Sequence, residues 1–125
     1  MINEILIYIG SAIIILWGIA HIIPTKNVVN GFGDISEDNK KIITLEWIAE
    51  GIALSFIGIL AIFITAFGNP TDLVNQLVYW ISSGAMLGLG ILTLVTAART
   101  PVIPFKICPI ILSIVITLFM LGSLL

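Results

Sequence analysis

Residues 42–67 read IITLEWIAEGIALSFIGILAIFITAF, and this stretch decides the fold of the chain. Its only ionisable side chains are Glu46 and Glu50, and most of the others are apolar. A helix of roughly 20 mostly apolar residues is long enough to cross the hydrocarbon core of a bilayer. We therefore predict a membrane-spanning helix that carries two carboxyl groups close to its beginning.

Three further stretches have the same apolar character and the required length. We predict helices over about residues 5–23, 73–98 and 107–125. The composition agrees, because 59% of the 125 residues are apolar, only 10% are charged, and the mean hydropathy is +1.21. A soluble domain carries about a quarter charged residues. The expected fold is all-α: residues 1–125 form a single transmembrane domain, an integral membrane four-helix bundle surrounded by the lipid bilayer.

Charge and cysteine content exclude several classes of protein. The net charge of −2 argues against a nucleic-acid partner, which requires a basic surface. The single cysteine, Cys108, excludes an intramolecular disulfide and a metal site built from several cysteines. His21 is the only histidine, so we predict no metal site. The sequence has no cofactor motif and leaves any cofactor unknown.

The basic residues indicate the orientation of the helices in the membrane. All five lie in the first and third connections between the predicted helices: Lys26, Lys40, Lys41, Arg99 and Lys106. Lys and Arg are retained on the cytoplasmic side of membrane proteins. We therefore expect both connections in the cytoplasm, both termini outside, and a multi-pass protein of the cell membrane.

Turn-forming and capping residues predict the character of the connections. The first connection, about residues 24–41, is expected to be a loop. Ser36 or Asp34 is expected to cap the following helix, which then begins before the membrane. In the third connection, Pro101 and Pro104 are expected to preclude a regular helix, because proline lacks a backbone N–H.

Small residues at helical spacing mark faces on which membrane helices pack closely. The first three predicted helices contain such residues: Gly10 and Gly18, then Gly51, Ser55 and Gly58, then Gly84 and Gly88. We expect these residues to pack helices within one chain. The alternative is a homodimer seam along the helix over residues 73–98.

Glu50 is the most informative residue, because a charge inside an apolar span is costly and faces a bundle interior, a cavity or a partner. It lies about two turns inside its helix, roughly 12 Å along the axis from Ile42. A cationic partner keeps such a carboxyl group ionised. His21 and Arg99 come from the same membrane level, so we predict that Glu50 contacts one or both of them.

The side chains around Glu50 define a candidate polar pocket at the cytoplasmic end. Its predicted members are Trp17, His21, Glu46, Trp47, Glu50 and Arg99. Glu46 lies nearer the surface and is expected to be solvated, whereas Trp17 is one turn from His21 on the same helix face. We interpret the cluster either as a site for a polar head group or proton transfer, or as a clamp that fixes three helices without chemistry. No catalytic residue is predicted.

The motifs around this cluster resemble those of a known family. Gly18-x-x-His21 ends the first predicted helix, and Glu46-Trp47-x-x-Glu50-Gly51 opens the second, which is followed by two more helices. This outline resembles the DoxX-like group of small four-helix membrane proteins, which includes a subunit of a thiosulfate–quinone oxidoreductase. The resemblance implies the four-helix fold. No reaction is carried over, because the sequence has neither a cofactor motif nor a dithiol.

Together these patterns predict a small integral membrane protein rather than an enzyme. It is expected to bind a hydrophobic small molecule such as a quinone or a lipid, or to serve as an accessory subunit of a larger membrane complex. One alternative is a proton-coupled transporter that uses Glu50 and acts as a homo-oligomer. Another is a DoxX-like redox subunit.

Overall fold

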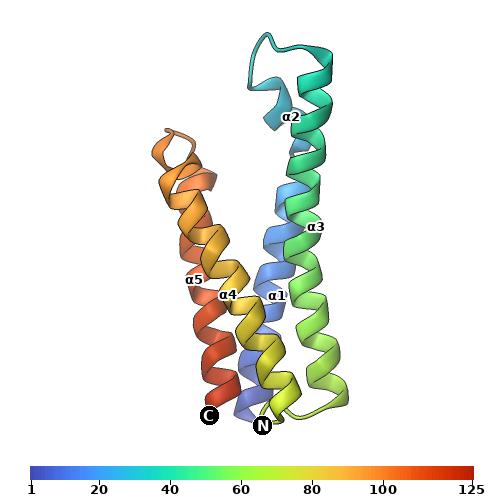
Figure 1. The fold of residues 1–125 in the computed structure, drawn as a ribbon, viewed down its shortest axis with the longest axis vertical. Coiled ribbons are helices and arrows are strands. Elements are labelled where there is room, and N and C mark those ends of the chain that lie inside the picture. The colour runs from blue at the N-terminus through green and yellow to red at the C-terminus, as the bar shows by residue number, and fades with distance from the viewer.

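The computed structural model of the protein describes residues 1–125 and contains helices but no strands. In chain order the helices are α1 (Ile2–Ile22), α2 (Thr25–Asn30), α3 (Glu37–Phe67), α4 (Leu73–Val95), the short 3-10 helix η1 (Ala97–Arg99) and α5 (Ile103–Leu124). Figure 1 shows their arrangement. The four long helices, α1, α3, α4 and α5, are long and apolar enough to cross a membrane. This result confirms the prediction of four apolar helices.

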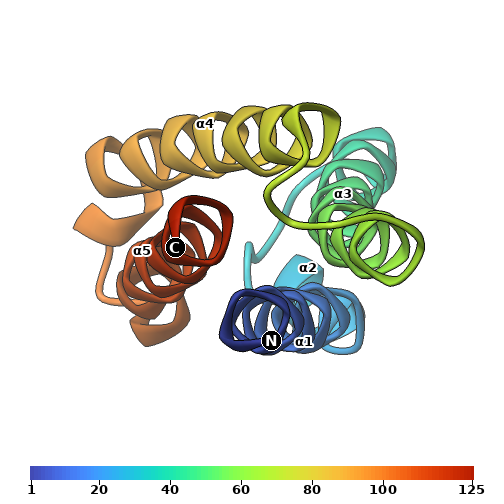
Figure 2. The ribbon, with the colours of Figure 1, turned by 90° about the horizontal axis from the view of Figure 1, so that it is seen from below.

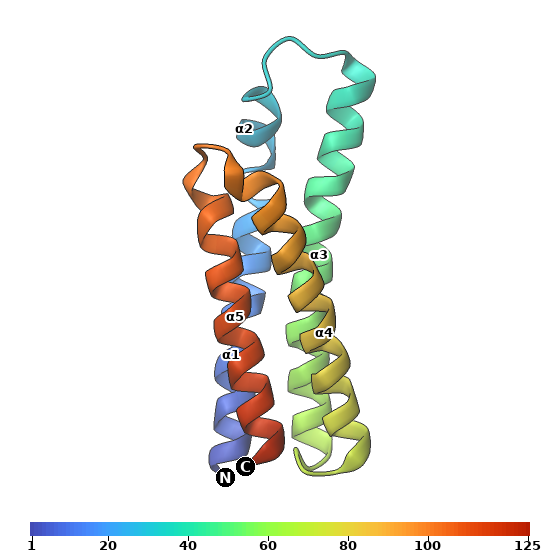
Figure 3. The same cartoon turned by 60° about the vertical axis from the view of Figure 1, so that its left-hand side comes forward.

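The long helices lie side by side in the spatial order α3, α1, α5, α4 (Figure 2). α1 packs against both α3 and α5, and α5 packs against α4, whereas α3 and α4 approach each other mainly near the turn that joins them. Both termini lie at the end of the molecule that carries this turn, and α2 lies at the opposite end (Figure 3). The helix pairs α1–α3 and α4–α5 therefore diverge toward the end that carries α2.

Glycines bring the backbones of α1 and α3 into contact. A Cβ atom on Gly18 would lie 2.7 Å from the carbonyl oxygen of Gly51, and one on Gly58 would lie 2.7 Å from the carbonyl oxygen of Ser11. Both distances are too short for any side chain. Small residues allow membrane helices to approach in this way, and the approach strengthens dispersion contacts. The predicted packing of helices within one chain is therefore confirmed for these two helices.

The glycines of α4 have a different setting. Gly84 and Gly88 are exposed, and a Cβ atom on either would meet nothing within 4 Å. They do not pack against another helix of the same chain, so the expectation of intramolecular packing is wrong for this pair. The homodimer seam along this helix stays a prediction.

Hydrogen bonds join α3, α4 and α5 at the end that carries the termini. The buried hydroxyl group of Tyr79 lies 2.7 Å from that of Thr65, which joins α4 to α3. The Trp80 indole donates to the Ser123 hydroxyl at 2.9 Å, and the Gln76 amide donates to the carbonyl of Ser123 at 2.8 Å. These contacts fix α4 between its two neighbours at this end.

The structure corrects several predicted boundaries. The first connection is not wholly a loop, because it contains α2, and α4 ends at Val95 rather than near residue 98. α3 begins at Glu37 rather than near residue 42, and Ser36 caps it, as predicted, by accepting a hydrogen bond from the Asn39 N–H at 3.1 Å. α5 begins at Ile103 rather than near residue 107. Pro104 does not preclude this helix because it lies in the first turn, where the backbone N–H has no acceptor within the helix.

Substituting Gly18 or Gly51 by alanine is expected to destabilise the protein, because the new Cβ atom would meet the backbone of the facing helix. Overpacking of this kind lowers the free energy of unfolding by about 1 to 3 kcal/mol. Unfolding in detergent, followed by circular dichroism, measures the change. Gly84→Ala is the matched control and is expected to stay within about 0.5 kcal/mol of the wild type. An equal loss in all three variants would contradict the proposed packing.

Candidate functional site

His21 and Glu50 meet at the end of the molecule that carries α2. His21 lies in the last turn of α1 and is only 6% exposed, whereas Glu50 lies on the facing helix α3 and is 32% exposed. The imidazole Nε2 and the carboxylate Oε2 are 3.2 Å apart. Nε2 has no hydrogen bond of good geometry. The contact is therefore an ion-pair contact across the α1–α3 interface, available when the imidazole is protonated.

Aromatic rings surround the imidazole of His21. The Trp47 ring stacks on it with centroids 4.3 Å apart and an interplanar angle of 22°, and the Trp47 indole N–H donates to the backbone carbonyl of His21. Trp17 approaches the imidazole edge-on with centroids 6.2 Å apart. Phe105 of α5 packs edge-on against Trp47 at 5.5 Å. The rings therefore come from α1, α3 and α5, and those of Trp17 and Trp47 contact the imidazole directly.

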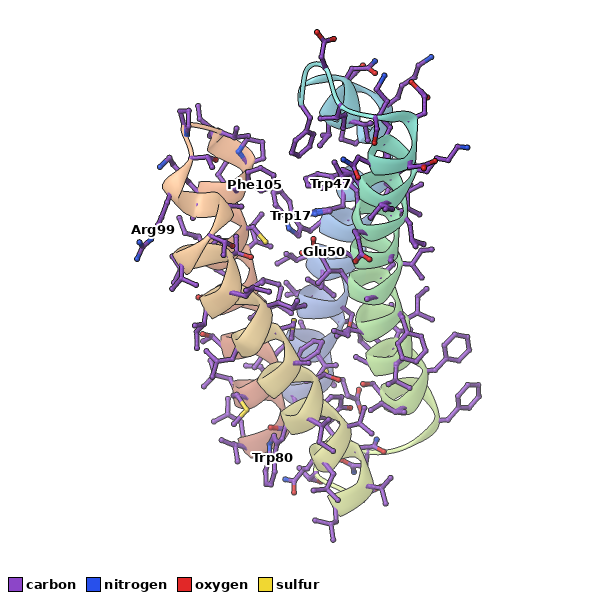
Figure 4. The ribbon with its side chains drawn as sticks, turned by 45° about the horizontal axis from the view of Figure 1, so that its top comes forward. Trp17, Trp47, Glu50, Trp80, Arg99 and Phe105 are labelled. Atoms are coloured by element: carbon purple, nitrogen blue, oxygen red, sulfur yellow. The ribbon has the colours of Figure 1, made fainter.

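A cavity of about 610 Å³ lies beside these rings, where the helix pairs diverge. This volume is in the range of about 300 to 1,000 Å³ that is typical of small-molecule sites. Four parts of the chain form its wall: the end of α1, α2 with the residues after it, α3, and the segment from the α4–α5 connection into α5. The residues that line it are Trp17, Ala20, His21, Pro24, Asn27, Val28, Gly31, Phe32, Trp47, Thr100, Val102, Pro104, Phe105 and Ile107. Figure 4 shows Trp17, Trp47 and Phe105 near this region.

Two of the six predicted site residues do not join this cluster. Arg99 is exposed in η1, forms no salt bridge, and points away from Glu50 (Figure 4). The prediction that it reaches the pocket is wrong, because α4 diverges from α3 at this end. Glu46 is exposed and also forms no salt bridge, in line with its expected solvated position.

Sequence reasoning missed the residues that complete the wall of the cavity. Phe105 was not singled out, and Val28 and Phe32 lie in a connection that was expected to be a loop. The one available signal was Pro104, since proline in the first turn of a helix would have placed Phe105 on α5. No comparable signal marked α2, a helix of only six residues.

The arrangement offers hydrogen bonding within an apolar wall. A neutral imidazole has one donor and one acceptor. The chain has no group of three or more His, Cys, Asp or Glu side chains placed to hold a metal ion. The chemistry of the site therefore rests on one imidazole and one carboxylate.

Comparison with known proteins gives no relative: no family model, no curated protein and no solved structure matches the chain.

Replacing Glu50 by alanine is expected to lower the free energy of unfolding by about 1 to 3 kcal/mol, because His21 then stays buried without its partner. Unfolding in detergent at neutral pH measures the loss. Glu46→Ala removes an equal charge one turn earlier on α3, where no salt bridge is present, and is expected to change stability by less than about 0.5 kcal/mol. Equal effects of the two substitutions would show that the contact with His21 contributes nothing.

Proposed function

We propose that this chain is a multi-pass membrane protein that binds a small hydrophobic molecule, a quinone or a lipid, in the cavity beside His21. One observation carries the proposal: a cavity of about 610 Å³ has an apolar and aromatic wall that includes a buried imidazole in contact with a carboxylate. Apolar pockets with a few polar groups are typical of sites for small molecules. The polar groups orient the ligand, and the aromatic rings supply most of the contact area.

The position of the cavity supports delivery of the ligand from the membrane. The cavity lies between the diverging pairs α1–α3 and α4–α5, and α3 and α4 approach each other mainly at the far end. A molecule dissolved in the bilayer can therefore reach this region from the side. Binding would suit either an independent protein or an accessory subunit of a membrane complex. The resemblance to the DoxX-like group stays a prediction, and it is compatible with both roles.

Filling the cavity is the direct test of this proposal. Ala20→Phe adds a ring to the wall of the cavity and is expected to reduce the amount of an alkylated quinone retained by the protein in lipid nanodiscs by about tenfold or more. Mass spectrometry of the extracted ligand measures the retention, with empty nanodiscs as the blank. Ala85→Phe, the same change on an exposed position of α4, is the matched control and is expected to retain the wild-type amount. Equal retention by both variants would contradict binding in this cavity.

We also propose that the end with α2 faces the cytoplasm. All five basic residues of the chain belong to the two connections at this end or to the first two turns of the helices that follow them, and the positive-inside rule assigns such an end to the cytoplasm. The termini would then lie outside the cell membrane.

Labelling of single cysteines in a Cys108→Ala background tests this orientation. A membrane-impermeant maleimide is expected to label Leu125→Cys in intact cells, and to label Asp34→Cys only after the cells are permeabilised. Both positions are exposed, so the folded protein does not block the reagent. The reverse pattern would place the end with α2 outside and contradict the proposed orientation.

A further inference from the structure

A second cavity, of about 400 Å³, lies between α2 and α3, and we call it the α2–α3 cavity. The residues that line it are Ile23, Thr25, Lys26, Val29, Asn30 and Thr44. None of them lines the cavity beside His21, to which α2 contributes Asn27 and Val28 from its opposite face. α2 therefore separates two cavities that share no residue.

The lining of the α2–α3 cavity contains a positive charge and no acidic side chain. The charge belongs to Lys26, which is exposed and forms no salt bridge. The hydroxyl groups of Thr25 and Thr44 already donate to backbone carbonyls of the preceding turn. The side-chain donors that remain for a ligand are the ammonium group of Lys26 and the amide of Asn30. These groups suit an anion whose oxygens accept several hydrogen bonds, as phosphate oxygens do.

The position of the α2–α3 cavity along the helices corresponds to the surface of a bilayer. Lys26 follows the apolar run over residues 5–23 by three positions, and Thr44 is the third residue of the apolar run over residues 42–67. The cavity therefore lies where both runs end, which is the level of lipid head groups around a helix that spans the hydrocarbon core. Ile23 lines the cavity and is 77% exposed, so it offers an apolar surface to an acyl chain beside the charge.

We infer that the α2–α3 cavity binds the phosphate group of an anionic phospholipid, with Lys26 and Asn30 as donors and Ile23 in contact with the lipid chains. Basic pockets at the cytoplasmic end of membrane helices bind lipid head groups in this way. A zwitterionic lipid also carries an ammonium group, for which the lining has no acidic partner. The inference rests on the proposed membrane setting, but it is independent of the ligand proposed for the cavity beside His21.

Native mass spectrometry of the full chain in a neutral detergent tests the inference. The probes are phosphatidylglycerol, phosphatidylcholine with the same acyl chains, and inorganic phosphate. We expect phosphatidylglycerol to bind about fivefold more tightly than phosphatidylcholine, in line with the contribution of one basic residue to binding at an anionic membrane surface. Inorganic phosphate in molar excess is expected not to displace phosphatidylglycerol, because it makes no contact with the apolar part of the site.

Variants of two lysines separate the site from a general attraction of positive charge. Lys26→Ala is expected to weaken phosphatidylglycerol binding about fivefold, whereas Lys26→Arg keeps a phosphate-binding cation and is expected to restore it. Lys41→Ala is the matched control, because Lys41 is exposed at the same end, forms no salt bridge and does not line the cavity. It is expected to stay within about twofold of the wild type.

Two further variants complete the test. Asn30→Asp places a carboxylate beside Lys26 in the lining and is expected to weaken phosphatidylglycerol binding, so it carries the test if Lys26→Ala does not fold. Ala20→Phe fills the cavity beside His21, which the α2–α3 cavity does not share. It is expected to leave phosphatidylglycerol binding unchanged.

Four results would overturn the inference. Equal affinity for the two lipids would remove the anionic head group, and equal effects of Lys26→Ala and Lys41→Ala would remove the site. Displacement by inorganic phosphate would make the occupant a soluble anion. Loss of phosphatidylglycerol binding in Ala20→Phe would assign the lipid to the cavity beside His21. Quinone retention in nanodiscs is measured separately, so the proposed function of that cavity and the lipid site can fail independently.

Discussion

The contact between the backbones of α1 and α3 fixes the position of everything at the candidate site. Gly18 faces Gly51 at a distance that no side chain allows. His21 follows Gly18 by three residues, and Glu50 directly precedes Gly51. The imidazole and the carboxylate therefore meet within about one turn of the point where the helices are closest. A wider spacing of α1 and α3 would separate them and would also move Trp47 away from the imidazole on which it stacks.

The two ends of the molecule are held by different forces, and this difference creates the cavity. At the end with the termini, Tyr79 bonds to Thr65, and Trp80 bonds to Ser123, so that α4 is joined to α3 and α5. Interhelical hydrogen bonds in membrane proteins contribute about 0.6 kcal/mol each on average. At the other end, the edge-on contact of Phe105 with Trp47 connects the two helix pairs. The pairs diverge there, and the space between them remains.

The sequence predicts the depth of a residue in the membrane better than it predicts which neighbouring helix that residue faces. The apolar runs predict the four long helices, and counting residues from each helix end places His21, Glu50 and Arg99 at similar depth. Depth alone does not say which helices are neighbours. Arg99 lies at the predicted end but on a helix pair that diverges from α3, so it points away (Figure 4). Phe105 joins the site for the opposite reason: α5 is a direct neighbour of α1, which no pattern in the sequence indicates.

The position of the ion pair also bears on whether it acts as a clamp or as a site. The close contact of Gly18 with Gly51 already holds α1 to α3 one turn away, so packing alone does not require a second, polar contact there. Replacing a buried ion pair by apolar residues is often neutral or stabilising, so stability is a weak reason to keep one. The imidazole moreover lines a cavity, and a clamp needs no open space beside it. These points agree with the proposed role of the pair in binding a small molecule.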